Sequence, residues 1–183
     1  FVAKSDQFTS LVQEIATLVA TQGSDAATSK ADAIDDLKVT LKENIELGEV
    51  VRVEAGDGQV LDSYVHRQDG RGVNGVIVVL DGGTAELAHD VAVHVAFAKP
   101  PYVRREDVPE ADVAEERATL ESVTRAEGKP EAALEKIVEG RLTGWFKERV
   151  LLDQGFVKDD KVTIAKMLDG VDIVSVSQVV VGG

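Results

Sequence analysis

Apolar positions near the start of the chain recur with the three- and four-residue spacing of amphipathic helices. The first run follows Ser5, an N-cap residue type, and the second covers residues 31–43, after a polar loop at residues 23–30. The apolar positions of the first run are Phe8, Leu11, Val12, Ile15, Leu18 and Val19, and those of the second are Ile34, Leu37 and Leu41. We therefore expect two helices before the first strand.

Strand patterns follow these helices. Residues 50–54 and 60–66 flank the tetrapeptide AGDG, whose glycines permit the positive φ angles of a tight turn, and this predicts a β-hairpin. Residues 75–80 (GVIVVL) are apolar on both faces, which suits a strand covered by helices. Residues 85–98 are predicted to form the next helix.

The second half of the chain predicts a helical hairpin. Prolines at positions 100, 101 and 109 exclude a continuous helix there, whereas residues 110–126 regain helical composition with an acidic first turn. A second helix is expected after Gly128-Lys129-Pro130, which acts as a stop and restart signal. We interpret the pair as a projecting, coiled-coil-like arm.

A short helix at residues 163–168 and a valine-rich strand at residues 173–181 close the chain. The order of elements predicts an α+β fold of two small antiparallel-sheet subdomains flanked by helices. The first covers residues 1–67, with two helices and the β-hairpin. The second covers residues 68–183 and carries the helical hairpin as an insertion at about residues 110–148.

The acidic composition argues against nucleic acids and anionic membranes as partners. The chain has 33 acidic and 20 basic residues, and its net charge of -13 repels phosphate backbones and anionic lipids. No apolar run approaches the roughly 20 residues of a membrane span. We expect a protein without direct nucleic-acid or membrane binding, and the cytoplasm is the default location.

No motif supports catalysis, a cofactor or a metal site. Residues 70–75 fit GxGxxG, but a strand follows them, whereas a dinucleotide site needs a helix there. His89 and His94 lie five residues apart, roughly 140° around a helix, and so do not share a face. An ordinary strand-end residue is one interpretation of His66. An enzyme would need a cleft around His66 and Asp62, and we predict that the chain is not an enzyme.

Five segments together resemble one protein family, elongation factor Ts. They are FVAKSDQF (1–8), LKENI (41–45), SYVHR (63–67), HVAFAKP (94–100) and EGKPEAALEKIVEGRLTGWFKERVLLDQGFV (127–157). Their order is the family's order over nearly the whole chain, which is more specific than any single motif. The resemblance implies a guanine nucleotide exchange factor of translation elongation. Such a factor binds the GTPase elongation factor Tu and promotes GDP release by wedging into its GTPase domain and disturbing its Mg²⁺ and phosphate site.

The resemblance also implies the residues that bind the partner. FVAK is similar to the end of the family's TDFVAK-type motif, in which an aspartate and a phenylalanine enter the GTPase domain. LKENI matches a segment packed on the partner, with lysine in place of the usual glycine, and SYVHR matches a partner-contacting strand. The implied partner-binding residues are Phe1, Val2, Leu41, Lys42, Asn44, Tyr64 and His66. His94, Lys99 and Pro100 are implied to be scaffold.

Several alternatives stay open. The family's small N-terminal domain of ubiquitin-associated type corresponds to sequence before Phe1, so we expect it to be lacking here. A holding or assembly module would bind elongation factor Tu without driving exchange. The arm could also form a homodimer, or a heterotetramer with the partner, instead of touching the GTPase.

Overall fold

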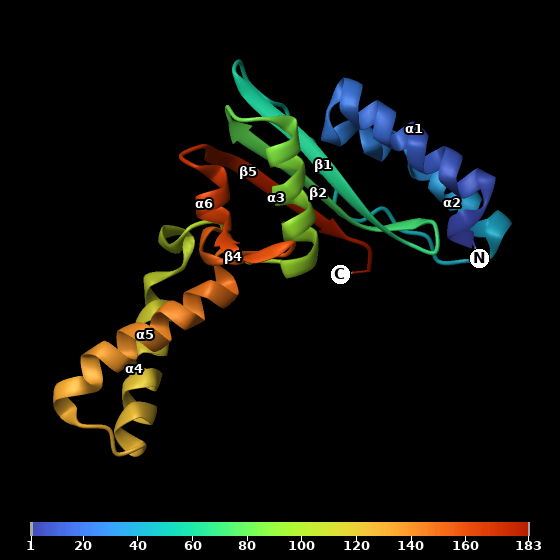
Figure 1. Ribbon diagram of the computed structural model, residues 1–183. Coiled ribbons are helices and arrows are strands. Elements are labelled where there is room, and N and C mark those ends of the chain that lie inside the picture. Colours follow the sequence, from blue (N-terminus) through green and yellow to red (C-terminus); the bar gives the residue numbers. More distant parts are fainter. Residues whose placement is uncertain (1, 183) are drawn as a thin grey trace.

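A three-stranded antiparallel sheet forms the centre of the protein (Figure 1). The computed structural model describes residues 2–182. β2 (Arg71–Asp81) is the middle strand, between β1 (Gln59–Gln68) and β5 (Asp172–Val180). Its residues 76–80 are buried or half-buried on both faces, which confirms the prediction from the apolar run.

One face of this sheet packs against α3 (Ala85–Ala98), whose predicted bounds are confirmed. The Thr84 hydroxyl caps the helix by accepting a hydrogen bond from the Leu87 amide at 3.1 Å. Alternate residues of β2 point toward the helix because side chains of a strand alternate between faces. The buried core here contains Val76, Val78, Leu80, Ala88, Val91, Ala92, Val95, Ala96, Leu151, Phe156, Ile164, Leu168 and Ile173.

The two predicted N-terminal helices are present and pack against each other. A 3₁₀ turn, η1 (Val2–Lys4), precedes α1 (Asp6–Gln22), and the Ser5 hydroxyl accepts from the Phe8 amide at 3.3 Å, as its N-cap position predicts. The segment predicted as a loop is a 3₁₀ helix, η2 (Ser24–Lys30), which leads into α2 (Ala31–Leu41). Figure 1 shows this helical pair set to one side of the sheet.

The predicted hairpin between residues 50–54 and 60–66 is wrong. Residues 43–58 form no strand, and β1 pairs with β2 instead, through a turn in which Asp69 and Gly70 have φ angles of 51° and 80°. β2 offers β1 a longer and more apolar partner than residues 50–54 do. The predicted boundary between residues 67 and 68 falls at this hairpin, and the division into two subdomains stays a prediction.

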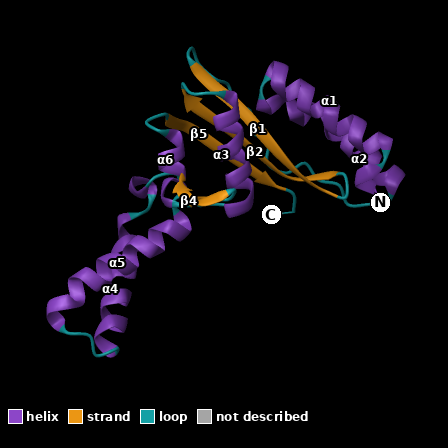
Figure 2. Ribbon diagram, in the orientation of Figure 1, coloured by secondary structure: helices purple, strands orange, loops and turns teal. Residues whose placement is uncertain are grey.

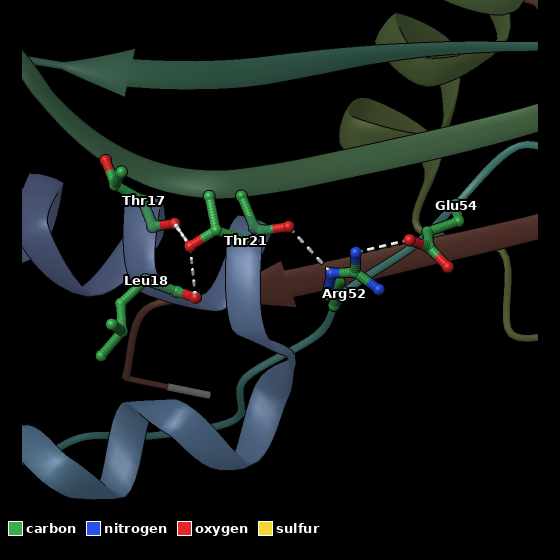
Figure 3. A network of polar contacts seen from close by, with 6 residues as sticks. Thr17, Leu18, Thr21, Arg52 and Glu54 are labelled. Atoms are coloured by element: carbon green, nitrogen blue, oxygen red, sulfur yellow. Dashed lines mark hydrogen bonds and ion pairs between the residues drawn. The ribbon is translucent and has the colours of Figure 1, made fainter.

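Residues 50–54, which were predicted to form a strand, contact α1 through Arg52 instead. Its Nε donates to the carbonyl oxygen of Ala20 at 3.1 Å, in the last turn of α1, and its guanidinium pairs with Glu54 (Figure 3). A cation at the C-terminal end of a helix satisfies a free carbonyl and complements the helix dipole. Residues 50–54 are therefore linked to α1 by the side chain of Arg52.

The helical hairpin is confirmed as α4 (Glu110–Ala126) and α5 (Glu131–Arg149), and it projects from the sheet (Figure 2). At its base, the Leu151 amide donates to the Tyr102 carbonyl at 2.9 Å, and Tyr102 and Val150 form a parallel bridge. A second apolar cluster of Val108, Leu142, Phe146 and Val150 lies at this base. The arm thus has a core separate from that of the sheet.

The chain returns from the arm through a compact segment beside the end of α3. It consists of η4 (Leu151–Asp153), the small antiparallel pair β3 (Gly155–Phe156) and β4 (Asp159–Thr163), and α6 (Ile164–Leu168). Another 3₁₀ turn, η3 (Arg105–Asp107), precedes α4. β3 and η4 have only two and three residues, and β4 (DDKVT) has no alternation of apolar residues, so the sequence pattern predicts none of them.

His94 connects α3 to this returning segment. The side chain is 1% exposed, its Nδ1 accepts from the Val157 amide at 3.2 Å, and its Nε2 lies 2.8 Å from Gln154 Oε1. Because the amide is a donor, Nδ1 must be unprotonated and Nε2–H donates to Gln154. The burial confirms His94 as a scaffold residue, and burial lowers its pKa although the Gln154 hydrogen bond opposes that shift.

Lys42 ends α2 in an unusual backbone conformation. Its φ and ψ are 54° and 39°, the left-handed region in which glycine is favoured because it has no Cβ. Lysine has a Cβ, so it keeps this turn at a cost in backbone strain.

We predict that His94 makes folding stability fall as pH falls. The pKa of His94 is lower in the folded chain than in the unfolded chain, so its contribution is complete above about pH 6.5 and is lost as pH falls toward the folded value. Urea unfolding at pH 7.5 and 5.5 should show a smaller difference for His94→Gln than for wild type. His89→Gln, which changes a half-exposed histidine, should keep the wild-type difference, and equal differences in all three proteins would contradict the prediction.

Lys42→Gly should raise the free energy of unfolding by about 0.5–1 kcal/mol. The relief of left-handed strain, roughly 1–2 kcal/mol, exceeds the roughly 0.4–1 kcal/mol that glycine costs through the entropy of the unfolded chain. The matched control is Lys38→Gly inside α2, which should lower stability by about 1 kcal/mol. Denaturant titration measures both changes, and a loss of stability in Lys42→Gly would be the contrary result.

Candidate partner-binding surface

The predicted site residues divide between two places in the fold, and the first is one end of the helical pair. Val2 lies in η1 before α1, and Leu41 and Lys42 end α2. Figure 1 places the N-terminal end of α1 beside the end of α2. Asn44 follows, exposed, with Nδ2 donating to Glu46 Oε1 at 3.1 Å. Phe1 lies outside the described residues.

The second place is the face of β1 that points toward α3. Tyr64 and His66 are two residues apart on this strand and so lie on one face, where the Tyr64 hydroxyl is 3.4 Å from His66 Nδ1. Both side chains are half-buried, and Tyr64 also packs against the main core. The alternation places Ser63 and Val65 on the opposite face of the sheet.

Two residues outside the predicted partner-binding set complete this surface. His89 and Phe97 lie on α3, and their rings approach those of β1: Tyr64 to His89 is 6.0 Å between centroids, and His66 to Phe97 is 5.8 Å. The four-residue spacing of His89, Val93 and Phe97 could have revealed this stripe, because such positions share one helix face. We call Tyr64, His66, His89 and Phe97 the aromatic patch.

One polar contact borders the aromatic patch. His89 Nδ1 lies 3.6 Å from Asp62 Oδ2, and both side chains are partly exposed. Asp62 and Tyr64 are two residues apart on β1, so they lie on the same face of the strand. The Asp62 carboxylate therefore lies beside the rings of the aromatic patch. The patch therefore combines an exposed apolar ring with hydrogen-bonding groups, a mixture that is typical of protein interfaces.

The two places are not joined by any polar or ring contact among residues 2–182. The described polar contacts of residues 2–42 with other side chains or backbone run within the helical pair or to Arg52, and Asn44 contacts only Glu46. If a single partner touches both places, its surface must span α1 and α2 as well as the sheet.

A groove of about 710 Å³ separates α1 from the face of the sheet opposite α3. Apolar side chains line it from three directions: α1, residues 47–54 and the sheet. Small residues on the sheet, Ser63, Gly75 and Ser177, leave this space open. The groove contains none of the predicted partner-binding residues.

Residues 2–182 bring no three His, Asp or Glu side chains into an arrangement that could hold a metal ion. The same part of the chain contains no helix with the length and apolar character to cross a membrane.

Comparison with known proteins gives one consistent result. The family described as Elongation factor TS matches residues 1–182. An elongation factor Ts of Paenarthrobacter aurescens is 42% identical over 196 residues, covering 100% of this chain and 70% of the relative. Those of Renibacterium salmoninarum and Thermobifida fusca are 44% and 42% identical, over 92% of this chain and 65% and 64% of theirs. The chain thus belongs to the elongation factor Ts family of translation elongation factors.

Proposed function

We propose that this protein is a guanine nucleotide exchange factor that binds elongation factor Tu in its GDP form and promotes release of GDP. The observation that carries the proposal is the family match along residues 1–182. The position of the implied contact residues supports it, because Leu41, Tyr64 and His66 all lie at least partly accessible on the surface.

The energetic demand favours contacts at both places. Speeding the release of a tight nucleotide by ~1000-fold requires about 4 kcal/mol of coupling between factor and nucleotide. Burial of one phenylalanine contributes roughly 1.5–3 kcal/mol, so a wedge formed by Phe1 is too small alone. In the proposed mechanism Phe1 disturbs the Mg²⁺ and phosphate site, while Leu41 and the face of β1 hold the factor in register.

Linkage makes the effect reciprocal. If the factor weakens GDP, GDP must weaken the factor by the same ratio, which lets the factor leave once nucleotide returns. Under this proposal the nucleotide chemistry belongs to the partner, and the chain acts by binding alone. Its place of action is the cytoplasm, where translation takes place.

Substoichiometric amounts of this chain should accelerate release of a fluorescent GDP from elongation factor Tu in excess unlabelled nucleotide. Turnover is expected because each copy dissociates when GTP or GDP rebinds the partner. The measurement is the release rate against factor concentration, with a separate titration for binding. Binding without acceleration would overturn the exchange role and favour a holding module.

Phe1→Ala and His66→Ala should each lower the exchange rate at limiting factor concentration, and together they should lower it more than either alone. For Phe1→Ala we expect about 10- to 150-fold, from the burial of one ring. Val174→Ala is the control, because it truncates an exposed residue on β5, at the other edge of the sheet. An unchanged rate in Phe1→Ala would reject the wedge.

A further inference from the structure

Phe97 is the one aromatic residue among the exposed large apolar side chains of residues 2–182. It is 63% exposed, although it lies in the last turn of α3, where neighbouring Val95 and Ala96 are buried. A ring of this size that remains in water gives up the stabilisation that burial would provide.

The Phe97 ring is held in place by its neighbour in the aromatic patch, His66. His66 and Phe97 meet edge to face, with an interplanar angle of 65°, and the Tyr64 hydroxyl lies 3.4 Å from His66 Nδ1. Edge-to-face pairs are favourable and fix the ring orientation. A side chain that is already oriented loses little conformational freedom when a partner covers it.

The backbone beneath Phe97 is fixed as well. Asn74, which pairs with His66 across the two strands, donates from Nδ2 to the Ala96 carbonyl at 2.9 Å. Gln178 of β5 donates to Asn74 Oδ1 at 3.1 Å and so braces it from the third strand. Hydrogen bonds thereby tie the end of α3 to β2 and, through Asn74, to β5, and the His66 ring adds a contact from β1. This makes the end of α3 a rigid support for a contact residue.

We infer that Phe97 is a binding anchor for elongation factor Tu, where it packs into an apolar hollow of the partner beside the group that contacts His66. This inference rests on the proposed function, because the occupant is argued from continuity with His66. Rigid aromatic side chains near the centre of a contact dominate binding energy, and truncation of one commonly weakens binding by a factor of 30 or more. Asp62 and His89 form the polar rim of this contact.

Phe97→Ala should weaken binding to elongation factor Tu by about 10- to 100-fold, with a smaller loss in Phe97→Tyr, which keeps the ring. The measurement is calorimetric titration of nucleotide-free elongation factor Tu with each full chain. Thermal unfolding should be nearly unchanged, because the ring is mostly exposed. Val174→Ala controls for loss of an exposed apolar group on β5 and should bind like wild type.

The outcomes separate this inference from the proposed function. If wild type does not bind elongation factor Tu, the proposed function fails. If His66→Ala weakens binding while Phe97→Ala does not, the interface stands and the anchor is rejected. If Phe97→Ala alters only self-association, as measured by sedimentation, the ring serves a contact between copies of this chain and the inference is overturned.

Discussion

The burial of β2 is the constraint on which the other elements depend. This strand pairs along nearly its whole length with β1 on one side and β5 on the other, and alternate side chains pack under α3. Antiparallel pairing fixes register, and a shift of one strand by one residue would exchange the two faces of that strand. The same pairing that buries Val78 therefore also sets Tyr64 and His66 against α3.

Local signals predicted single elements well, and they failed where two segments competed for one partner. α3 and the caps at Ser5 and Thr84 follow from short-range spacing, because capping is a local interaction. β1 could have paired with residues 50–54 or with β2. The alternation of apolar residues at 50–54 does not indicate which of these two pairings forms. The spacing of His89, Val93 and Phe97 places these residues on one helix face, but periodicity alone does not indicate whether that face is buried, and the exposure of Phe97 follows from the fold.

The two places of the proposed interface, the aromatic patch and the helical pair, are attached to the rest of the fold in different ways. The aromatic patch is backed by a continuous core and by hydrogen bonds from β2 and β5. The helical pair is connected to the sheet through residues 43–58, with the Arg52 contact and an open groove between them. A partner that engages both would meet one surface backed by a continuous core and one that is joined to the sheet by few polar contacts.

The bridge between Tyr102 and Val150 has a consequence for how this protein can change in evolution. It places the entry and exit of the arm side by side, and the cluster around Phe146 closes the base beneath the two helices. Whole helical turns could be added to or removed from both helices without altering the distance that the sheet must span. The length of the arm can thus change while the sheet and the base of the arm stay the same.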